Sequence, residues 1–278
     1  MVSDDESLGQ RIEECTVEPG TVACAWLGQA GYLLKSPAGL TMLIDPYFSD
    51  YGEDQWGLKR VISPPIDYRT FRPDLILSSH WHEDHLDAPV IKHYAHEPEI
   101  VLVGPNACVL RAAAWGWPAE RLVELNTGSQ YEVADVRITA TFARHHVPHA
   151  PAPDAVGFLL EFDGIRLWDV ADTEYDARLR PMRDAQIDVM FVPINGVGGN
   201  MNANEAALLA WHVQPRVAIP MHYNMWAPEG FGPGATLDPG AFADTYSRLG
   251  GTGEVRILEV GEIVTLPAIP SDPLNLPF

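Results

Sequence analysis

Short apolar runs separated by Gly and Pro dominate the chain beyond residue 20 and predict many β-strands. The predicted strands are Thr21–Leu27, Gly31–Lys35, Leu40–Ile44, Asp74–Ser78, Ile100–Val103, Ser129–Val133, Val136–Phe142, Ala155–Phe162, Ile165–Val170, Asp188–Pro193, Val217–Pro220, Val255–Leu258 and Glu262–Leu266. Segments typical of helices are Ala88–Tyr94, Asn106–Trp115, Tyr175–Arg183, Ala203–Val213 and Pro239–Leu249. Asn202 and Glu205 form a capping-box pattern before the fourth of these helices. Strand groups followed by helices favour an α/β or α+β fold, with two packed mixed sheets and helices outside.

The segments around these elements predict the domain organisation. Residues 1–20 are polar and acidic and predict a loosely held N-terminal arm, and residues 267–278 are a Pro-rich, irregular tail. Residues 21–266 between them are expected to form a single domain. The long segment Tyr47–Arg72 lacks periodicity, and a loop of this length in a compact domain usually has a function. Its aromatic residues could cover a substrate; they are Tyr47, Phe48, Tyr51, Trp56 and Tyr68.

The composition is that of a globular protein, with 46% apolar and 20% charged residues among 278. Its 18 Lys and Arg against 38 Asp and Glu give a net charge of −20 with neutral His. Such a chain repels polyanions, so we expect neither nucleic acid nor an anionic membrane as a partner. Three cysteines at unrelated spacings, an acidic N-terminus and no apolar run of about 18 residues favour a cytoplasmic protein.

The densest group of candidate metal ligands is His80-Trp81-His82-Glu83-Asp84-His85, which directly follows a predicted strand. Neutral imidazole and carboxylate are the ligands that borderline divalent metals prefer. His80 and His82 can face one cation because they lie two apart on an extended segment. Asp84 and His85 follow a bend and can reach a second cation. A solvated His-rich turn is the plainer alternative, but the segment joins a hydrophobic strand to a predicted helix, which argues against it.

Further candidate ligands lie where other predicted strands end. The adjacent His145 and His146 follow one strand, Asp172 follows another, and His222 ends a third. Each is weak evidence by itself, but α/β sheets place their sites beyond the C-terminal ends of strands. Adjacent residues of an extended segment point to opposite sides, so only one residue of the His pair should face the metals. We prefer His145, because the strand pattern ends there, and His146 remains the alternative.

The order H-x-H-x-D-H, then a His, Asp-Thr and a final His, resembles that of the metallo-β-lactamase superfamily from about Thr21 to Leu266. Asp45 matches the Asp that ends an early strand in that superfamily and supports the metal loop. Within the superfamily the chain is most similar to the L-ascorbate-6-phosphate lactonase group. A weaker similarity to N-acyl-phosphatidylethanolamine-hydrolysing phospholipase D lies in the stretches Asp45-Pro-Tyr-Phe-Ser and Leu58-Lys-Arg. The stretches similar to the lactonases are Trp26-Leu-Gly-Gln-Ala-Gly, Val192-Pro-Ile-Asn-Gly-Val-Gly-Gly-Asn-Met-Asn and Ile219-Pro-Met-His-Tyr-Asn-Met-Trp.

The resemblance implies a four-layer αββα sandwich of the metallo-β-lactamase fold. It also implies two divalent metal ions per chain, Zn²⁺ or Mn²⁺, with iron as a further option. The implied ligands are His80, His82 and His145 for the first ion, Asp84, His85 and His222 for the second, and Asp172 as a bridge between them. Asp45 would support the metal loop from outside the ligand set.

Candidate substrate-binding residues lie in two of the similar stretches. The Gly-rich segment Asn195–Asn200 precedes a capped helix, and its backbone N–H groups could bind an anionic group of the substrate. The alternative is that it forms only a tight turn. Trp226 flanks the last ligand motif and, like Trp56 and Trp81, could line the pocket. The predicted set is Asn195, Gly198, Asn200, Tyr223, Asn224 and Trp226.

These features predict a metal-dependent hydrolase that opens a small ester, lactone or cyclic amide. Two cations would lower the pKa of a bridging water from about 15.7 to roughly 7 and so supply hydroxide. Asp84 would orient this nucleophile and take its proton, and His222 is the second catalytic candidate. Two alternatives stay open: a phosphodiesterase acting on a small nucleotide or phospholipid-like substrate, and a non-catalytic metal-binding protein. The expected partner is a small-molecule substrate, and the protein could also form a homo-oligomer.

Overall fold

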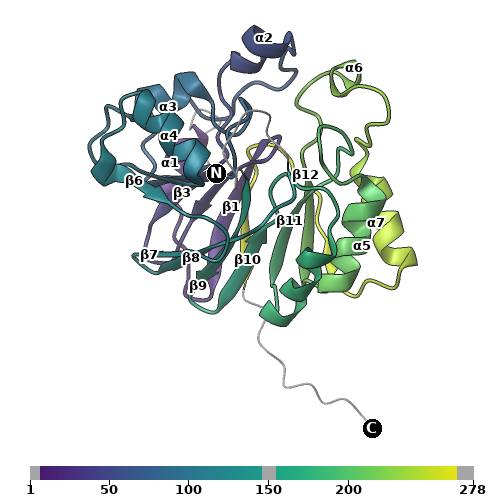
Figure 1. Cartoon of the computed structure of the whole chain (residues 1–278). Helices are drawn as coiled ribbons and strands as arrows, with labels where there is room; N and C mark the ends of the chain where they lie inside the picture. Colours follow the sequence, from purple (N-terminus) through teal and green to yellow (C-terminus); the bar gives the residue numbers. More distant parts are fainter. Residues whose placement is uncertain (1–6, 146–154, 268–278) are drawn as a thin grey trace.

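The structure, a computed structural model, describes residues 7–145 and 155–267 and contains two seven-stranded mixed sheets (Figure 1). In spatial order the first sheet consists of β14 (Ile263–Pro267), β1 (Thr21–Gly28), β2 (Gly31–Lys35), β3 (Thr41–Ile44), β4 (Leu75–Leu77), β5 (Val101–Gly104) and β6 (Leu122–Glu124). The second consists of β13 (Glu254–Val255), β12 (Val217–Met221), β11 (Val189–Pro193), β10 (Ile165–Asp169), β9 (Val156–Phe162), β8 (Val136–Phe142) and β7 (Gln130–Val133).

Each sheet has a parallel half, and these halves position the site. Strands β3 to β6 run parallel in the first sheet, as do β10 to β13 in the second. The C-terminal ends of parallel strands open at the same edge of a sheet, where side chains from several loops can meet. Helices α2 (Tyr51–Trp56) and α6 (Pro228–Phe231) lie above this edge at the top of Figure 1.

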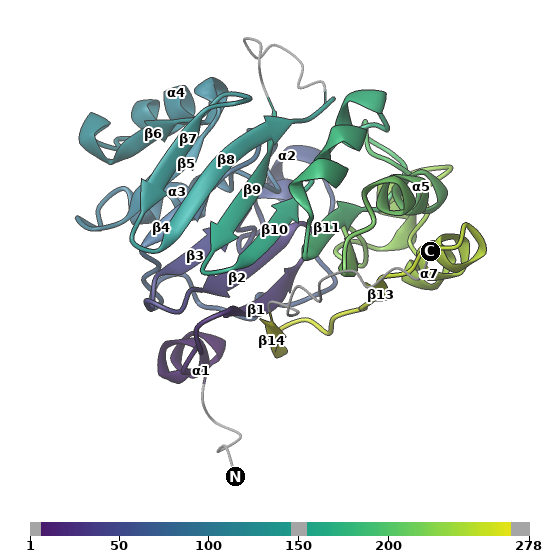
Figure 2. The ribbon, with the colours of Figure 1, turned by 90° about the horizontal axis from the view of Figure 1, so that it is seen from below.

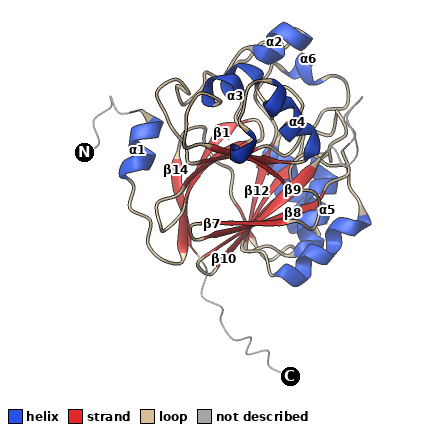
Figure 3. Ribbon diagram, turned by 60° about the vertical axis from the view of Figure 1, so that its left-hand side comes forward, coloured by secondary structure: helices blue, strands red, loops and turns tan. Residues whose placement is uncertain are grey.

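Helices cover the outer faces of the two sheets, as Figures 2 and 3 show. Helices α1 (Leu8–Glu14), α3 (Ala88–Tyr94) and α4 (Asn106–Ala114) contribute apolar residues to the core on the outside of the first sheet. Helices α5 (Ala203–Val213) and α7 (Pro239–Arg248) pack on the second. The predicted two-sheet αββα architecture is confirmed. None of the helices in the described part of the chain is long and apolar enough to span a bilayer.

Strand β1 shows why the sequence folds into this sandwich. Successive side chains of a strand point to opposite faces, so an entirely apolar strand must be covered on both sides. The side chains that join the core between the sheets are Val22, Cys24 and Trp26, and those that join the core under the helices are Ala23, Ala25 and Leu27. The strand is therefore fixed between two layers, and it cannot shift by one residue without exchanging its two faces.

The expectation of a loosely held N-terminal arm is wrong for the described residues from Ser7 onward. Helix α1 begins with a complete capping box, in which the Ser7 and Gln10 side chains each accept from the other residue's backbone N–H. Leu8 and Ile12 lie one turn apart and are both buried against the first sheet. The acidic composition hid this short amphipathic pattern, and tertiary burial stabilises a helix that would be marginal alone.

The other differences from the predicted elements are local. The long segment Tyr47–Arg72 contains α2, and the predicted helix near Tyr175 is a 3-10 helix, Ala177–Ala185, that includes Pro181. Proline lacks the N–H that an α-helix interior requires. Strand β13 stops at Val255, because the chain then crosses toward the first sheet, where it forms β14. The sequence pattern also gave no sign of β6 or α6. The predicted tail from residue 268 onward lies outside the described residues.

Candidate metal centre

The motif His80–His85 lies on the loop that leaves β4. Strand β4 is completely buried and delivers the chain to the open edge of the first sheet. His80 forms an isolated β-bridge with Ala155, which ties the start of the loop to the second sheet. The backbone N–H groups of His85 and Leu86 both donate to the His82 carbonyl, closing a turn that places Asp84 and His85 across from His80.

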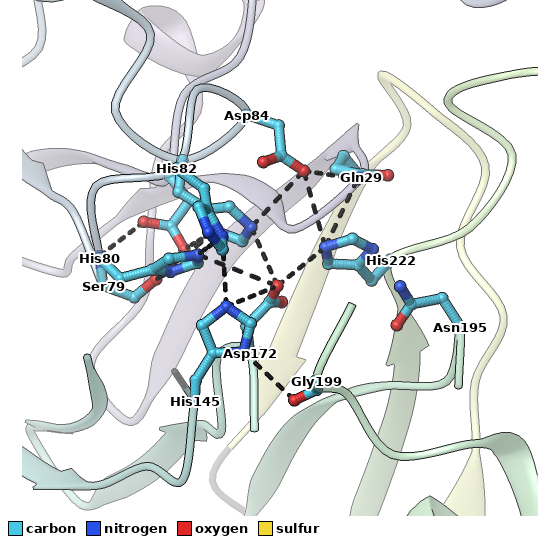
Figure 4. Close-up of polar contacts among 12 residues, drawn as sticks. Gln29, Ser79, His80, His82, Asp84, His145, Asp172, Asn195, Gly199 and His222 are labelled. Carbon is cyan, nitrogen blue, oxygen red and sulfur yellow. Dashed lines mark hydrogen bonds and ion pairs between the residues drawn. The ribbon is translucent and has the colours of Figure 1, made fainter. Parts of the chain in front are cut away.

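The remaining candidate ligands come from the second sheet. His145 follows β8, Asp172 follows β10 and His222 follows β12 directly. All three side chains are buried and point toward the His80–His85 loop (Figure 4). The structure therefore brings together all seven predicted metal ligands, although they span 143 positions of the sequence (222 − 80 + 1).

Three imidazoles form the first group of potential ligands. His82 Nδ1 lies 2.9 Å from His80 Nε2 and 3.2 Å from His145 Nε2. Two nitrogens bound to one tetrahedral Zn²⁺ at ~2.0–2.1 Å would lie about 3.3 Å apart. These nitrogens are therefore already spaced as ligands of a single ion.

Asp84, His85 and His222 form the second group. The Asp84 Oδ2 atom lies 3.6 Å from His85 Nε2 and 3.7 Å from His222 Nε2. Asp172 lies between the two groups: its Oδ2 is 3.2 Å from His222 Nε2 and 3.4 Å from His85 Nε2. The same oxygen is 4.0 Å from the Nε2 atoms of both His80 and His145. This central oxygen is placed as a bridging ligand would be.

Asp45 and Ser79 orient two of these imidazoles from outside the ligand set. The buried Asp45 carboxylate accepts from the Ser79 N–H at 2.7 Å and the Ser79 hydroxyl at 2.6 Å, and its Oδ2 lies 2.7 Å from His85 Nδ1. Because the carboxylate accepts, His85 Nδ1 carries a proton, and Nε2 is the atom left to face the site and bind a metal. The Ser79 hydroxyl, having donated to Asp45, accepts from His80 Nδ1 at 3.0 Å, which fixes the same tautomer in His80. Asp45 thus has the supporting position implied by the resemblance.

Two further contacts orient ligands and were not predicted. The Gly199 carbonyl accepts from His145 Nδ1 at 3.2 Å, so the Gly-rich segment positions a ligand through its backbone. Gln29, which is fully buried, donates from Nε2 to Asp84 Oδ2 at 2.7 Å and lies 3.4 Å from His222 Nε2. Gln29 belongs to one of the stretches similar to the lactonases, but nothing in its local sequence marks it as a contact of Asp84.

Burial and charge set the protonation states of the group. Burial, followed by the charges of the neighbouring imidazoles, lowers the pKa of His80 well below its usual value. Burial also lowers the pKa of His82 to about 4, although Asp84 opposes it. Burial would lower the pKa of His85 as well, but Asp172, Asp84 and Asp45 together raise it well above its usual value. His80 and His82 are therefore neutral lone-pair donors at pH 7, whereas the carboxylates favour the doubly protonated, positively charged form of His85, whose Nε2 proton a bound cation would replace.

The donor set fits divalent cations. The ion pairs of Asp84 and Asp172 within the described chain all go to histidines, so no Lys or Arg neutralises these buried carboxylates. His85 Nε2 and Asp172 Oδ1 are buried without a hydrogen-bond partner among the described residues. Buried charges are normally paired or coordinate metals, and an orphaned buried polar atom costs about 1–3 kcal/mol. Cations held by these atoms would remove both the cost of burying the carboxylate charges and the cost of leaving the polar atoms without a partner.

A cavity of about 300 Å³ opens directly onto the ligands. The ligands that it reaches are His82, Asp84, Asp172 and His222. The predicted residues Asn195, Gly198, Asn200 and Trp226 line the same cavity, as does Trp56. Trp81 does not: the Arg111 guanidinium stacks on its ring at 3.1 Å on the outer side of the loop.

The predicted substrate-binding role of Tyr223 and Asn224 is corrected by the structure. Tyr223 is 2% exposed and packs in the core between the sheets, with its ring 5.0 Å from that of Trp26. Adjacent residues diverge at this turn, so His222 faces the cavity while Tyr223 points away from it. Asn224 is exposed and does not line the cavity. His146, the alternative to His145, lies outside the described residues.

Two adjoining groups of His and Asp side chains at the strand ends of an αββα sandwich define a metal-dependent hydrolase. Residues 23–222 match the Beta-lactamase superfamily domain, and the chain belongs to this superfamily. The predicted membership is thus confirmed. The identity and number of the bound ions remain predictions.

Relatives and solved structures agree with this assignment. A protein named UPF0173 metal-dependent hydrolase from Polynucleobacter asymbioticus is 32% identical over 249 residues, which cover 81% of this chain and 82% of the relative. A probable L-ascorbate-6-phosphate lactonase from Salmonella gallinarum is 27% identical over 266 residues, 79% of this chain and 74% of that protein. The structure of a metallo hydrolase from Ignicoccus hospitalis has a TM-score of 0.68 at 22% identity and covers 88% of this chain and 98% of its own, which shows the shared fold.

Proposed function

We propose that this hydrolase acts on a small ester, lactone or cyclic amide. The observation that carries the proposal is the cavity, because it brings a compact molecule into contact with Asp84, Asp172 and His222 at once. Its volume of about 300 Å³ is at the lower end of the range for ligand pockets, which favours a small substrate. The similarity to a probable lactonase supports the same class of bond.

The residues of the site would divide the work in a simple way. Divalent cations held by the seven ligands would lower the pKa of a bound water to roughly 7 and polarise a carbonyl oxygen. Asp84 lines the cavity while Gln29 holds its Oδ2 atom, so the carboxylate has a fixed orientation in which it can accept a proton from the attacking water. His222 lines the cavity beside it and would stay fixed as a ligand next to the reacting carbonyl.

A chelation and screening experiment tests the proposal. The purified protein would be assayed with aryl esters, γ- and δ-lactones, cyclic amides and bis(p-nitrophenyl) phosphate, before and after dialysis against a chelator. We expect hydrolysis of at least one carbonyl compound, its loss on chelation, and its return with Zn²⁺ or Mn²⁺. Activity on the phosphodiester alone would favour the phosphodiesterase alternative, and metal binding without any turnover would favour the non-catalytic one.

A variant separates the metal site from the fold. His82→Ala removes the nitrogen on which the first group converges, so we expect metal content and activity to fall together. His96→Ala serves as the matched control, because His96 is an exposed histidine outside the ligand groups. Full activity of His82→Ala, or of a metal-free preparation, would refute the proposed function.

A further inference from the structure

The cavity has an aromatic and aliphatic wall beside the metal ligands, where the Trp56 ring lies 6.4 Å from that of His82. The Trp226 ring lies edge to face with that of Trp56 at 6.1 Å and tilted against that of Phe231 at 5.2 Å between ring centroids. Three segments far apart in sequence build this wall, and a β-bridge between Arg60 and Trp226 holds two of them together. The apolar lining residues are Trp56, Leu58, Val197, Trp226 and Phe231.

No positive side chain lines the described part of the cavity. Residues 1–6, 146–154 and 268–278, which the structure does not describe, contain neither Lys nor Arg, and their only histidines are His146 and His149. The basic residues nearest along the chain, Lys59 and Arg60, do not line the cavity. Lys59 is exposed, and the Arg60 guanidinium covers the Tyr47 ring, donates to the carbonyls of Tyr47 and Ile62, and keeps one buried nitrogen, Nη2, without a hydrogen-bond partner among the described residues.

Two amide side chains provide the polar part of the cavity beside the ligands. Asn195 donates from Nδ2 to the Val197 carbonyl at 3.3 Å, which leaves its Oδ1 free to accept. The Oδ1 atoms of Asn195 and Asn200 are both buried and have no hydrogen-bond partner among the described residues. Both side chains line the cavity, so a bound molecule with an N–H or O–H group would satisfy them.

We propose that the substrate is an uncharged ester, lactone or cyclic amide that carries an apolar group and a hydrogen-bond donor. This inference rests on the proposed function and narrows it. The apolar group would lie against Trp56, Trp226 and Phe231, and the donor would face Asn195 and Asn200. A phosphate or carboxylate on the same molecule would meet the apolar wall with no cation other than the metals to compensate its desolvation. The site therefore selects against anionic lactones.

Matched substrates test the charge preference. The metal-loaded protein would be assayed with γ-butyrolactone bearing a phenyl group and with the same ring bearing a phosphomethyl group. We expect kcat/KM for the phenyl compound to be more than about a hundredfold higher, because the anion loses its hydration without gaining a partner. Equal or better hydrolysis of the phosphorylated ring would overturn the inference.

Variants test the wall itself. Trp56→Ala should raise KM for the phenyl-substituted lactone by about tenfold, and should raise it more than KM for unsubstituted γ-butyrolactone. Trp56 is 40% exposed, so this change should not disturb folding. Leu110→Ala, at an exposed leucine of α4 outside the cavity, is the matched control and should change neither value. Leu58→Lys should shift the preference toward the phosphorylated ring, and an identical preference in this variant would contradict the inference.

A binding measurement separates this inference from the proposed hydrolysis. The ketone 3-phenylcyclopentanone resembles the lactone but cannot be hydrolysed, and calorimetric titration would compare it with cyclopentanone. We expect the phenyl compound to bind at least about tenfold more tightly to the wild type and to lose this advantage in Trp56→Ala. If these results hold while no ester, lactone or amide is turned over, the proposed function fails and the pocket chemistry stands. Equal binding of the two ketones would overturn the inference even if hydrolysis is found.

Discussion

Asp45→Asn is the sharpest test of how the metal ligands are oriented. The wild-type carboxylate is fully buried, accepts two hydrogen bonds from Ser79 and contacts His85 Nδ1, all within 2.7 Å. An Asn of the same shape can keep an oxygen toward His85 and the Ser79 hydroxyl, but its NH₂ group then faces the Ser79 N–H. Two buried donors, the Ser79 N–H and the Asn NH₂, are left unsatisfied at about 1–3 kcal/mol each, and two charge-assisted bonds become neutral ones. We therefore expect a loss of about 2–5 kcal/mol in the free energy of unfolding.

The same change should weaken metal binding by about 10- to 100-fold, because His85 loses the partner that fixes its tautomer. Metal affinity would be measured by competition with a chromophoric chelator, and unfolding by urea in the presence of EDTA. Asp74→Asn is the control, since Asp74 also accepts from a backbone N–H and a hydroxyl, both of Thr41, but lies outside the ligand groups. The reasoning is refuted if Asp45→Asn binds metal as tightly as Asp74→Asn does.

Three further changes have defined outcomes. Gly199→Ala should lower metal occupancy, because its Cβ would lie 3.3 Å from His145 Nδ1; Gly198→Ala, equally left-handed but with open space around it, should leave metal content unchanged. Gln29→Met should lower kcat by about tenfold at full metal content, because Asp84 loses its donor, and an unchanged kcat would contradict this role. Ile12→Ala should cost about 2–5 kcal/mol in urea unfolding if α1 is part of the core, and an arm would show no loss.

The ligands themselves could be predicted from the sequence because they lie just after predicted strands. Apolar runs with flanking Gly or Pro mark the strands, and a buried strand that ends in His or Asp marks a functional edge. His80, Asp172 and His222 all obey this rule, and the structure places them within one centre. The density of the His80–His85 motif supplied the rest.

The supporting contacts could not be predicted, because they depend on tertiary geometry. Gln29 lies 55 residues from Asp84, and its position follows from the pairing of β1 with β2 and not from any local pattern. Gly199 accepts through a backbone carbonyl, which every residue possesses, so its contact with His145 leaves no side-chain signal in the sequence. Tyr223, by contrast, was predicted to bind substrate and does not. The similarity of its stretch to the lactonases placed it near the site, but the turn after His222 directs its ring into the core.

Left-handed backbone conformations are concentrated around the metal centre. Eight non-Gly residues in the described chain have a left-handed backbone, and the five near the site are Gln29, Asp45, Ala171, His222 and Asn224. Such conformations cost of order 1–3 kcal/mol each and persist only where the surroundings over-determine them. Here the surroundings are the ends of both sheets, because Asp45 follows β3 while His222 follows β12. Cations held between these turns would join the two halves of the sandwich, so metal binding would compensate both the backbone strain and the burial of the carboxylates.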